Sequence, residues 1–202
     1  MKRKRTLLLV MIAMIVLSLT NTETLHIKDL TSFFYEKILL DNREQTNELE
    51  TDHVIISRVI DGDTVLVTTS EGEEERVRLL LIDTPESVSP REPVQKFGPE
   101  AAAFAKQRLK QGQTVTLEKG NPQRDQYGRL LGYLWINDEN FNKSMIEKGY
   151  ARVAYVFPPN TKYVDEFREA EHKAKDSGVG IWSIPGYVTE NGFDMSVVND
   201  ME

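Results

Sequence analysis

The sequence of 202 residues contains no cysteine. This absence excludes disulfide bonds, the cysteine-rich scaffolds of small secreted domains and every zinc site that is built on thiolates. Histidine is also scarce, and the three histidines stand far apart, without the short spacing of a metal site. A fold of this chain must therefore be held by its hydrophobic core, for which 40% of the residues are available.

The chain also lacks the excess of positive charge that is typical of proteins that coat nucleic acids, because its formal net charge is −7. The acidic excess is concentrated in residues 21–52 and 189–202, whereas residues 53–188 are close to neutral. A near-neutral domain can hold a phosphate group where a few arginines converge, although its affinity for nucleic acid at physiological salt stays low. The charge thus excludes a tight coat protein and permits an enzyme that releases its product.

No hydrophobic run reaches the ~20 residues that a membrane-spanning helix usually needs. The longest run extends from Leu7 to Leu19 and follows four basic residues at positions 2–5. This arrangement is typical of an export signal, so we expect a secreted, extracellular protein with residues 1–20 as its signal. No clear small-residue cleavage site follows, which leaves a cleaved signal peptide and a retained N-terminal membrane anchor both open.

Three further segments differ in composition. Residues 21–52 are polar and acidic and are interpreted as a linker or pro-segment. Residues 53–188 carry regular β and α patterns and are expected to form the globular domain. Residues 189–202 are acidic again and are expected to form a flexible tail.

Five strands and three helices are expected in the globular domain. Short turns, the first at Asp61-Gly62, join three β-rich runs into a meander. Pro99 and Glu100 suit the start of a helix after Gly98, and Asn140 can cap a second, short helix. The expected strands are residues 53–60, 64–69, 75–82, 113–120 and 128–138. Strands that arrive as three and then two, with helices after them, predict an α+β fold with a small closed β-barrel.

Three polar clusters follow the ends of these strands, at residues 61–64, 78–86 and 125–129. The first two contain aspartates, a threonine and a glutamate, which together form an oxygen-rich set suited to a hard cation such as calcium. Their spacing does not match an EF-hand loop. Each cluster also has a plain structural interpretation, since an Asp-Gly pair is usually only a turn and an isolated strand arginine usually lies at the surface.

Taken together, the clusters indicate a known family. The motifs IDGDT, RLLLIDTPE, KFGPEA, DQYGR and GIWS occur in this order within residues 53–185, and the chain resembles the staphylococcal nuclease (thermonuclease) family. The resemblance implies a five-stranded β-barrel of the oligonucleotide-binding (OB) type with three α-helices. It also implies a calcium-dependent endonuclease, a hydrolase that cuts DNA and RNA with little sequence preference and leaves 3′-phosphates. We expect a monomer without an obligate protein partner.

The resemblance assigns roles to individual residues. The implied calcium ligands are Asp63, Asp83 and the backbone carbonyl of Thr84, with Asp61 as an outer partner that does not touch the metal. The implied catalytic residues are Arg78, Glu86 and Arg129. The implied contacts to the nucleotide are Tyr127 and Tyr155. Arginine forks suit the equatorial oxygens of a phosphodiester, and a carboxylate suits the attacking water.

The sequence departs from the family pattern at the edge where substrate would bind. Gln126 stands where a lysine is familiar, Phe157 replaces a tyrosine, and Arg91-Glu92 replaces two basic residues. These changes concern affinity for the substrate and leave the implied metal and catalytic residues intact.

Two other functions are weighed against a nuclease. A non-catalytic nucleic-acid-binding barrel would be expected to lack one or more of the implied metal and catalytic residues, all of which are present. A calcium-dependent structural or adhesive surface module would explain the export signal and the carboxylates, but it would leave both arginines without a role.

Overall fold

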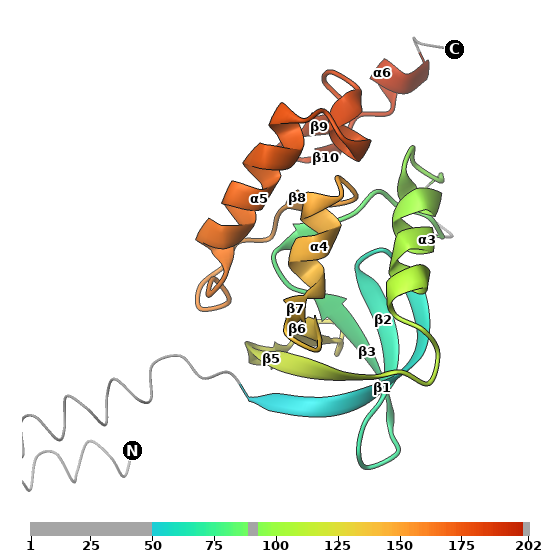
Figure 1. The fold of residues 1–202 in the computed structure, drawn as a ribbon, viewed down its shortest axis with the longest axis vertical. Coiled ribbons are helices and arrows are strands. Elements are labelled where there is room, and N and C mark those ends of the chain that lie inside the picture. Colours follow the sequence, from blue (N-terminus) through green and yellow to red (C-terminus); the bar gives the residue numbers. More distant parts are fainter. Residues whose placement is uncertain (1–49, 89–92, 200–202) are drawn as a thin grey trace, which may run out of the picture. The chain divides into compact units, whose positions relative to one another are not determined.

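A computed structural model describes residues 50–88 and 93–199 of the chain (Figure 1). The expected export signal, most of the expected linker and the pair Arg91-Glu92 lie outside the described residues. Within the described part, no helix combines the length and the apolar character that crossing a membrane requires.

The central element is a β-barrel of five strands, as the sequence predicts. The strands are β1 (Thr51–Asp61), β2 (Thr64–Thr68), β3 (Glu74–Leu79), β5 (Thr114–Arg124) and β6 (Leu130–Ile136). They pair in the order β3-β2-β1-β5-β6, and a parallel pairing of β3 with β6 closes the sheet (Figure 1). The two-residue strand β7 (Glu139–Asn140) continues the edge beside β6. The closed barrel confirms the predicted OB-type α+β fold.

Two strand boundaries differ from the prediction. Strand β1 begins at Thr51, inside the segment that was expected to be a linker. The run at residues 75–82, expected to be one strand, is interrupted because Leu81 adopts a left-handed backbone conformation with φ 63°. Its last part is a separate strand, β4 (Ile82–Asp83), which pairs with β8 (Arg152–Val153) outside the barrel sheet.

Three helices cover the barrel, namely α3 (Gly98–Arg108), α4 (Phe141–Glu147) and α5 (Val164–Asp176). Pro99 lies in the first turn of α3, as the sequence predicts. The Asn140 side chain caps α4 by accepting a hydrogen bond from the Lys143 amide at 3.2 Å, which confirms the predicted cap.

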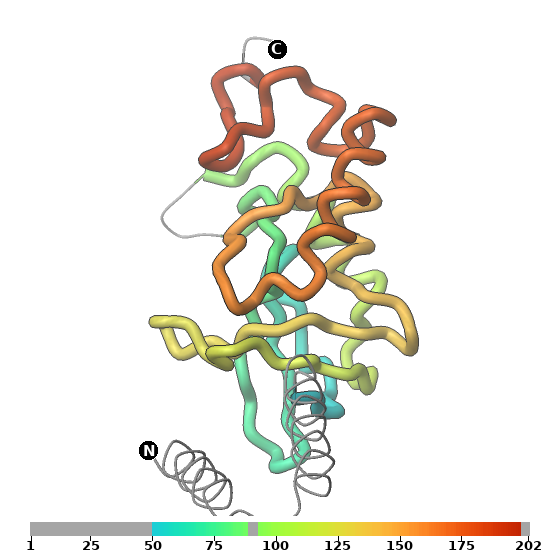
Figure 2. Tube along the Cα trace, turned by 90° about the vertical axis from the view of Figure 1, so that its left-hand side faces the viewer, coloured from blue at the N-terminus to red at the C-terminus, as the bar shows by residue number. Residues whose placement is uncertain are grey.

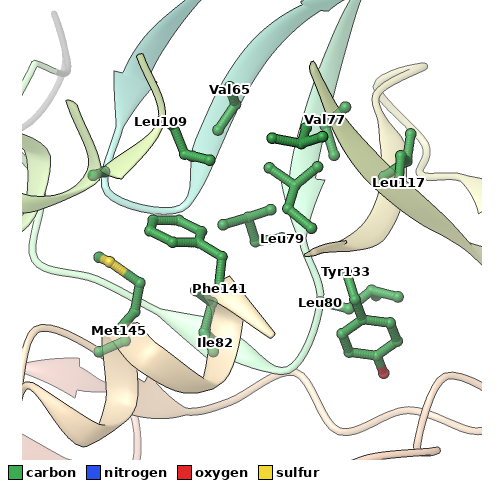
Figure 3. Close-up of a cluster of buried hydrophobic side chains, with 14 of the residues drawn as sticks. Val65, Val77, Leu79, Leu80, Ile82, Leu109, Leu117, Tyr133, Phe141 and Met145 are labelled. Carbon is green, nitrogen blue, oxygen red and sulfur yellow. The ribbon is translucent and has the colours of Figure 1, made fainter. Parts of the chain in front are cut away.

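The main hydrophobic core lies between the barrel strands and helix α4 (Figure 3). Val65, Val77 and Leu79 alternate with more exposed residues along β2 and β3, as period-two strands require. Phe141 and Met145, four positions apart on α4, complete the same cluster and are fully buried. This core fixes the rim of the barrel from which the polar clusters project.

The C-terminal segment differs from the predicted flexible tail. After the short helix η1 (Gly180–Ser183), strands β9 (Val188–Thr189) and β10 (Gly192–Phe193) form an antiparallel pair, followed by α6 (Ser196–Asn199). We call residues 188–193 the C-terminal hairpin. A second apolar cluster, centred on buried Ile181, Tyr187 and Val198, holds this segment, and Trp182 packs against it. The prediction of a flexible tail was therefore wrong for residues 189–199, where paired strands and apolar packing order the chain.

Candidate active site

The first two polar clusters meet because the turn between β1 and β2 approaches the end of β4 closely. Gly62 sits at this contact: a Cβ atom there would lie 2.8 Å from Thr84 Oγ1 and 3.1 Å from the Ala101 Cβ. Both distances are shorter than ordinary van der Waals contact, so the absence of a side chain at Gly62 permits the approach. The turn thereby brings Asp63 beside the segment that begins at Asp83.

The two aspartates that the family resemblance assigns to calcium both lie near the guanidinium of Arg78. Asp63 Oδ2 lies 3.1 Å from Arg78 Nη2, and the same nitrogen is 3.7 Å from Asp83 Oδ1. Asp63 Oδ2 also accepts hydrogen bonds from the amide and the hydroxyl of Thr84, each at 3.2 Å. Burial raises the pKa of Asp83, and the charge of Asp63 acts in the same direction, whereas Arg152 and Arg78 oppose it. A buried and a partly buried carboxylate thus lie close together here and require cations for compensation.

Asp61 lines the same pocket as Asp63 but has different hydrogen-bond partners. Its Oδ1 accepts a hydrogen bond from the Ser87 hydroxyl at 2.6 Å and another from the Gly62 amide at 2.8 Å. The pKa of Asp61 is raised to about 6, chiefly by burial and also by the charges of Asp63 and Glu86, which together outweigh the lowering effect of the two hydrogen bonds. Through its hydrogen bond with Ser87, Asp61 holds the loop that contains Glu86 in place.

Gln95 holds the backbone of Glu86 through two hydrogen bonds. The Gln95 side chain accepts a hydrogen bond from the Glu86 amide at 2.8 Å, and the Gln95 amide donates to the Glu86 carbonyl at 2.9 Å. The Glu86 carboxylate accepts a bond from the Val88 amide at 2.8 Å and lines the same pocket as Asp63. Its backbone is therefore held while one carboxylate oxygen stays available to the pocket.

Arg78 and Arg129 lie on adjoining parts of the barrel. Val77 pairs with Leu130 in the parallel register of β3 and β6, so Arg78 lies one position after this pair and Arg129 one position before it. Asp125 orients Arg129 by accepting from its Nε at 2.7 Å and from its amide at 2.9 Å. Among the described residues, the two terminal nitrogens of Arg129 form no hydrogen bond, so they can bind a ligand.

Each of these arginines lies over an aromatic ring. The Arg78 guanidinium lies 5.3 Å from the centre of the Tyr155 ring, and that of Arg129 lies 5.6 Å from the Tyr127 ring. Both tyrosines are exposed, as is Phe157. Together they form an aromatic margin around the arginines on which a base could stack.

One pocket of about 760 Å³ unites these groups. Its walls include most of the side chains that the sequence singles out, namely Asp61, Asp63, Arg78, Glu86, Gln126, Tyr127, Arg129, Tyr155 and Phe157. Asp83 and Thr84 lie directly behind it through their contacts with Arg78 and Asp63. The structure thus brings together every residue to which the resemblance assigns a role.

Three residues that position the candidate site cannot be identified from the sequence alone. Gln95 positions Glu86, Ser87 positions Asp61, and Arg152 donates from Nε to Asp83 Oδ2 at 2.9 Å. Each acts through a contact between segments that are separated along the chain, and none lies in a motif of recognisable chemistry. The alternation of apolar residues around Arg152 indicates only a strand.

The oxygen atoms at this point could hold a hard cation such as calcium. In residues 50–88 and 93–199, no three His, Asp or Glu side chains are grouped as metal ligands. The pair of carboxylates at Asp63 and Asp83 supplies two anionic oxygens, and the adjacent Thr84 backbone supplies a carbonyl. Calcium accepts such mixed sets of carboxylate, carbonyl and water oxygens.

Comparisons with known proteins agree with this geometry. Residues 76–184 match the family described as staphylococcal nuclease homologue. The chain is 42% identical over 149 residues to endonuclease YncB of Bacillus subtilis, covering 73% of this chain and 70% of that protein. It is 39% identical over 140 residues to a thermonuclease of Staphylococcus intermedius, covering 69% of this chain and 82% of the relative. The match to the prophage-derived endonuclease YokF is 43% identical but spans 47% of that longer protein. The chain belongs to the staphylococcal nuclease family.

Proposed function

We propose that this protein is a calcium-dependent endonuclease that hydrolyses phosphodiester bonds of DNA and RNA with little sequence preference and leaves 3′-phosphates. The observation that carries the proposal is the convergence of Asp63, Glu86 and two arginines on one pocket of about 760 Å³, with Asp83 directly behind it. Relatives that are named endonuclease or thermonuclease support hydrolysis of nucleic acids. We propose that the enzyme acts as a monomer on DNA and RNA, without an obligate protein partner.

Asp63, Asp83 and the Thr84 carbonyl would hold the calcium ion. When bound, calcium supplies positive charge that stabilises the negative charge developing on the phosphate. Arg78 already lies between the two aspartates, with its Nη1 donating to the carbonyls of Leu79 and Ile82 at 3.0 and 3.1 Å. These bonds fix the plane of the guanidinium before substrate arrives.

The protein's own residues divide the remaining work. The terminal nitrogens of Arg129 bind phosphate oxygens from one side of the pocket, while Asp125 holds the guanidinium in place. Glu86 orients a water molecule and accepts its proton as the water oxygen bonds to phosphorus. The bond between phosphorus and the 5′-oxygen breaks, the 5′-oxygen takes a proton from solvent water and leaves as a hydroxyl, and the phosphate stays on the 3′ side. Tyr127 and Tyr155 position the nucleotide at the rim.

The first test concerns the metal. Calcium should support cleavage of plasmid DNA, of single-stranded DNA and of RNA, while magnesium should support it poorly. Magnesium requires a tighter octahedral geometry and loses its bound water reluctantly, whereas two carboxylates and a carbonyl form an open set. Turnover of each substrate is measured after EDTA treatment and return of one ion. Equal rates in the two ions would contradict the calcium assignment, and binding without cleavage in any ion would favour the non-catalytic barrel.

A second test separates catalysis from simple phosphate binding. In Arg129→Lys the charge stays but the planar fork is lost, so kcat is expected to fall by about 10²–10³, with little change in KM. Arg78→Lys should show the same pattern. The matched control is Arg108→Lys, because Arg108 pairs with Glu139 and does not line the pocket. If KM rose while kcat stayed at the wild-type value, the arginines would be phosphate anchors and not catalytic groups.

A further inference from the structure

Arg152 connects the candidate metal site to the C-terminal hairpin. On one side its Nε donates to Asp83 Oδ2 at 2.9 Å. On the other side its Nη1 lies 3.2 Å from the Glu190 carbonyl oxygen and 3.4 Å from that of Thr189. Its guanidinium also lies 5.9 Å from the centre of the Phe193 ring. One side chain thus spans from an implied calcium ligand to the hairpin.

The contact between Arg152 and Asp83 is well defined. The two residues are direct partners in the antiparallel pair of β4 and β8, and their side chains are 11% and 15% exposed. Arg152 binds Asp83 Oδ2, whereas Asp83 Oδ1 is the oxygen that faces Arg78. The carboxylate is therefore fixed at one oxygen, and its other oxygen lies near the Arg78 guanidinium, which also contacts Asp63.

Contacts with the rest of the domain hold the C-terminal hairpin in place beside Arg152. Tyr187, fully buried just before the hairpin, donates a hydrogen bond from its hydroxyl to the Lys96 carbonyl, and its ring lies 6.1 Å from that of Phe97. Figure 2 shows the C-terminal segment beside the segment that leads into α3. The hairpin itself is closed by the hydroxyl of Thr189, which donates to the Gly192 carbonyl at 3.1 Å.

We propose that Arg152 is a positioning residue: the C-terminal hairpin holds it against Asp83, and it thereby orients the Asp83 carboxylate for calcium. The hairpin lies outside residues 76–184, which match the family. The proposal rests on the proposed function, because it assigns Asp83 to calcium. It adds a part of the chain beyond the family match to the machinery of the site.

Simple Coulomb interaction predicts the opposite result from positioning. A cation close to a calcium site repels calcium, so neutralising Arg152 would strengthen calcium binding if charge alone mattered. If orientation of the ligand dominates, neutralising Arg152 weakens calcium binding, since loss of a group that orients a metal ligand typically costs about 10–100-fold in affinity. The sign of the change therefore separates the two explanations.

The experiment is a calorimetric titration of calcium into the folded protein without nucleic acid. Arg152→Gln is expected to raise the Kd for calcium by about 10–100-fold. Phe193→Leu keeps apolar bulk but removes the ring beneath the guanidinium, and a loss of about two- to five-fold is expected. In the Arg152→Gln background, Phe193→Leu should have no further effect, because both act through one side chain. Arg108→Gln is the control for loss of a paired arginine and should leave the Kd unchanged.

Thermal unfolding without calcium tests whether each variant is folded, and a purely structural role would lower the Tm without changing the Kd of the folded protein. An unchanged or lower Kd in Arg152→Gln would overturn the proposal, as would independent effects of the two substitutions. If Arg152→Gln does not fold, Phe193→Leu alone decides the matter through its Kd. Failure of the wild-type protein to bind calcium would instead contradict the proposed function, so the two failures are distinguishable.

Discussion

Replacement of Glu86 by glutamine is expected to lower kcat by about 10²–10⁴, the range that is typical for loss of a general base. Glutamine has the same shape but cannot take a proton from the attacking water. Its amide oxygen can still accept the hydrogen bond from the Val88 amide, and the two bonds between the backbone of Glu86 and Gln95 are unaffected. The loss should therefore be chemical and not a consequence of a displaced loop. Single-turnover cleavage of a defined oligonucleotide at saturating calcium measures it.

Asp63→Ala provides the comparison for this prediction. Asp63 contacts Arg78 and Thr84 directly, so its removal should weaken calcium binding strongly. Glu86→Gln should change the affinity for calcium less, because within the described residues the Glu86 carboxylate hydrogen-bonds the Val88 amide and not the proposed calcium ligands. Equal impairment of calcium binding in the two variants would show that Glu86 is a metal ligand rather than the residue that handles water.

Gly149→Ala is expected to destabilise the fold by about 2–6 kcal/mol, the sum of left-handed backbone strain and a forced steric overlap. Gly149 follows α4 with φ 69°, and a Cβ atom there would lie 2.3 Å from the Val179 carbonyl oxygen. The obstacle is backbone and cannot rotate away. The Gly149 carbonyl also accepts a hydrogen bond from the Ile181 amide at 2.8 Å, so movement would break this contact. Chemical denaturation of both proteins measures the change in the free energy of unfolding.

Gly178→Ala separates the two causes. Gly178 has a similar φ of 59°, but a Cβ atom there would meet nothing within 4 Å. In this variant only the strain of the left-handed conformation should lower the free energy of unfolding, by about 1–2 kcal/mol. If the two variants lose the same free energy, the close approach of the backbones at Gly149 does not matter to stability.

The elements that could be predicted from the sequence are those with local causes. The first two strands of the meander are joined at Asp61-Gly62, as predicted. Helix α3 begins with Pro99 in its first turn, and Asn140 caps α4, also as predicted. The division of the third strand could not be predicted, because leucine rarely adopts the conformation of Leu81. The order in residues 189–199 also escaped prediction, since it depends on apolar packing around Ile181, Tyr187 and Val198, which the acidic composition of the segment does not indicate.

The same division applies to the candidate site. Residues in recognisable motifs, such as Asp63 and Glu86, could be selected because the family's chemistry needs carboxylates there, and their assigned roles stay predictions. The sequence does not indicate which carboxylate Arg152 contacts, because the pairing of β4 with β8 joins segments 69 positions apart. Contacts of this range depend on the whole fold and leave no local pattern.

The parallel pairing of β3 with β6 also has a consequence for how the enzyme first becomes active. Arg78 and Arg129 are neighbours only through this closure, which joins strands on either side of α3 and β5. Pairings of such long range form slowly, because the intervening chain must be ordered before the contact contributes stability. A chain that has folded only its first meander therefore has Asp63 and Arg78 in place but no complete site, because Asp83 lies in β4, which pairs with β8. We therefore expect catalytic competence only after β3 has paired with β6.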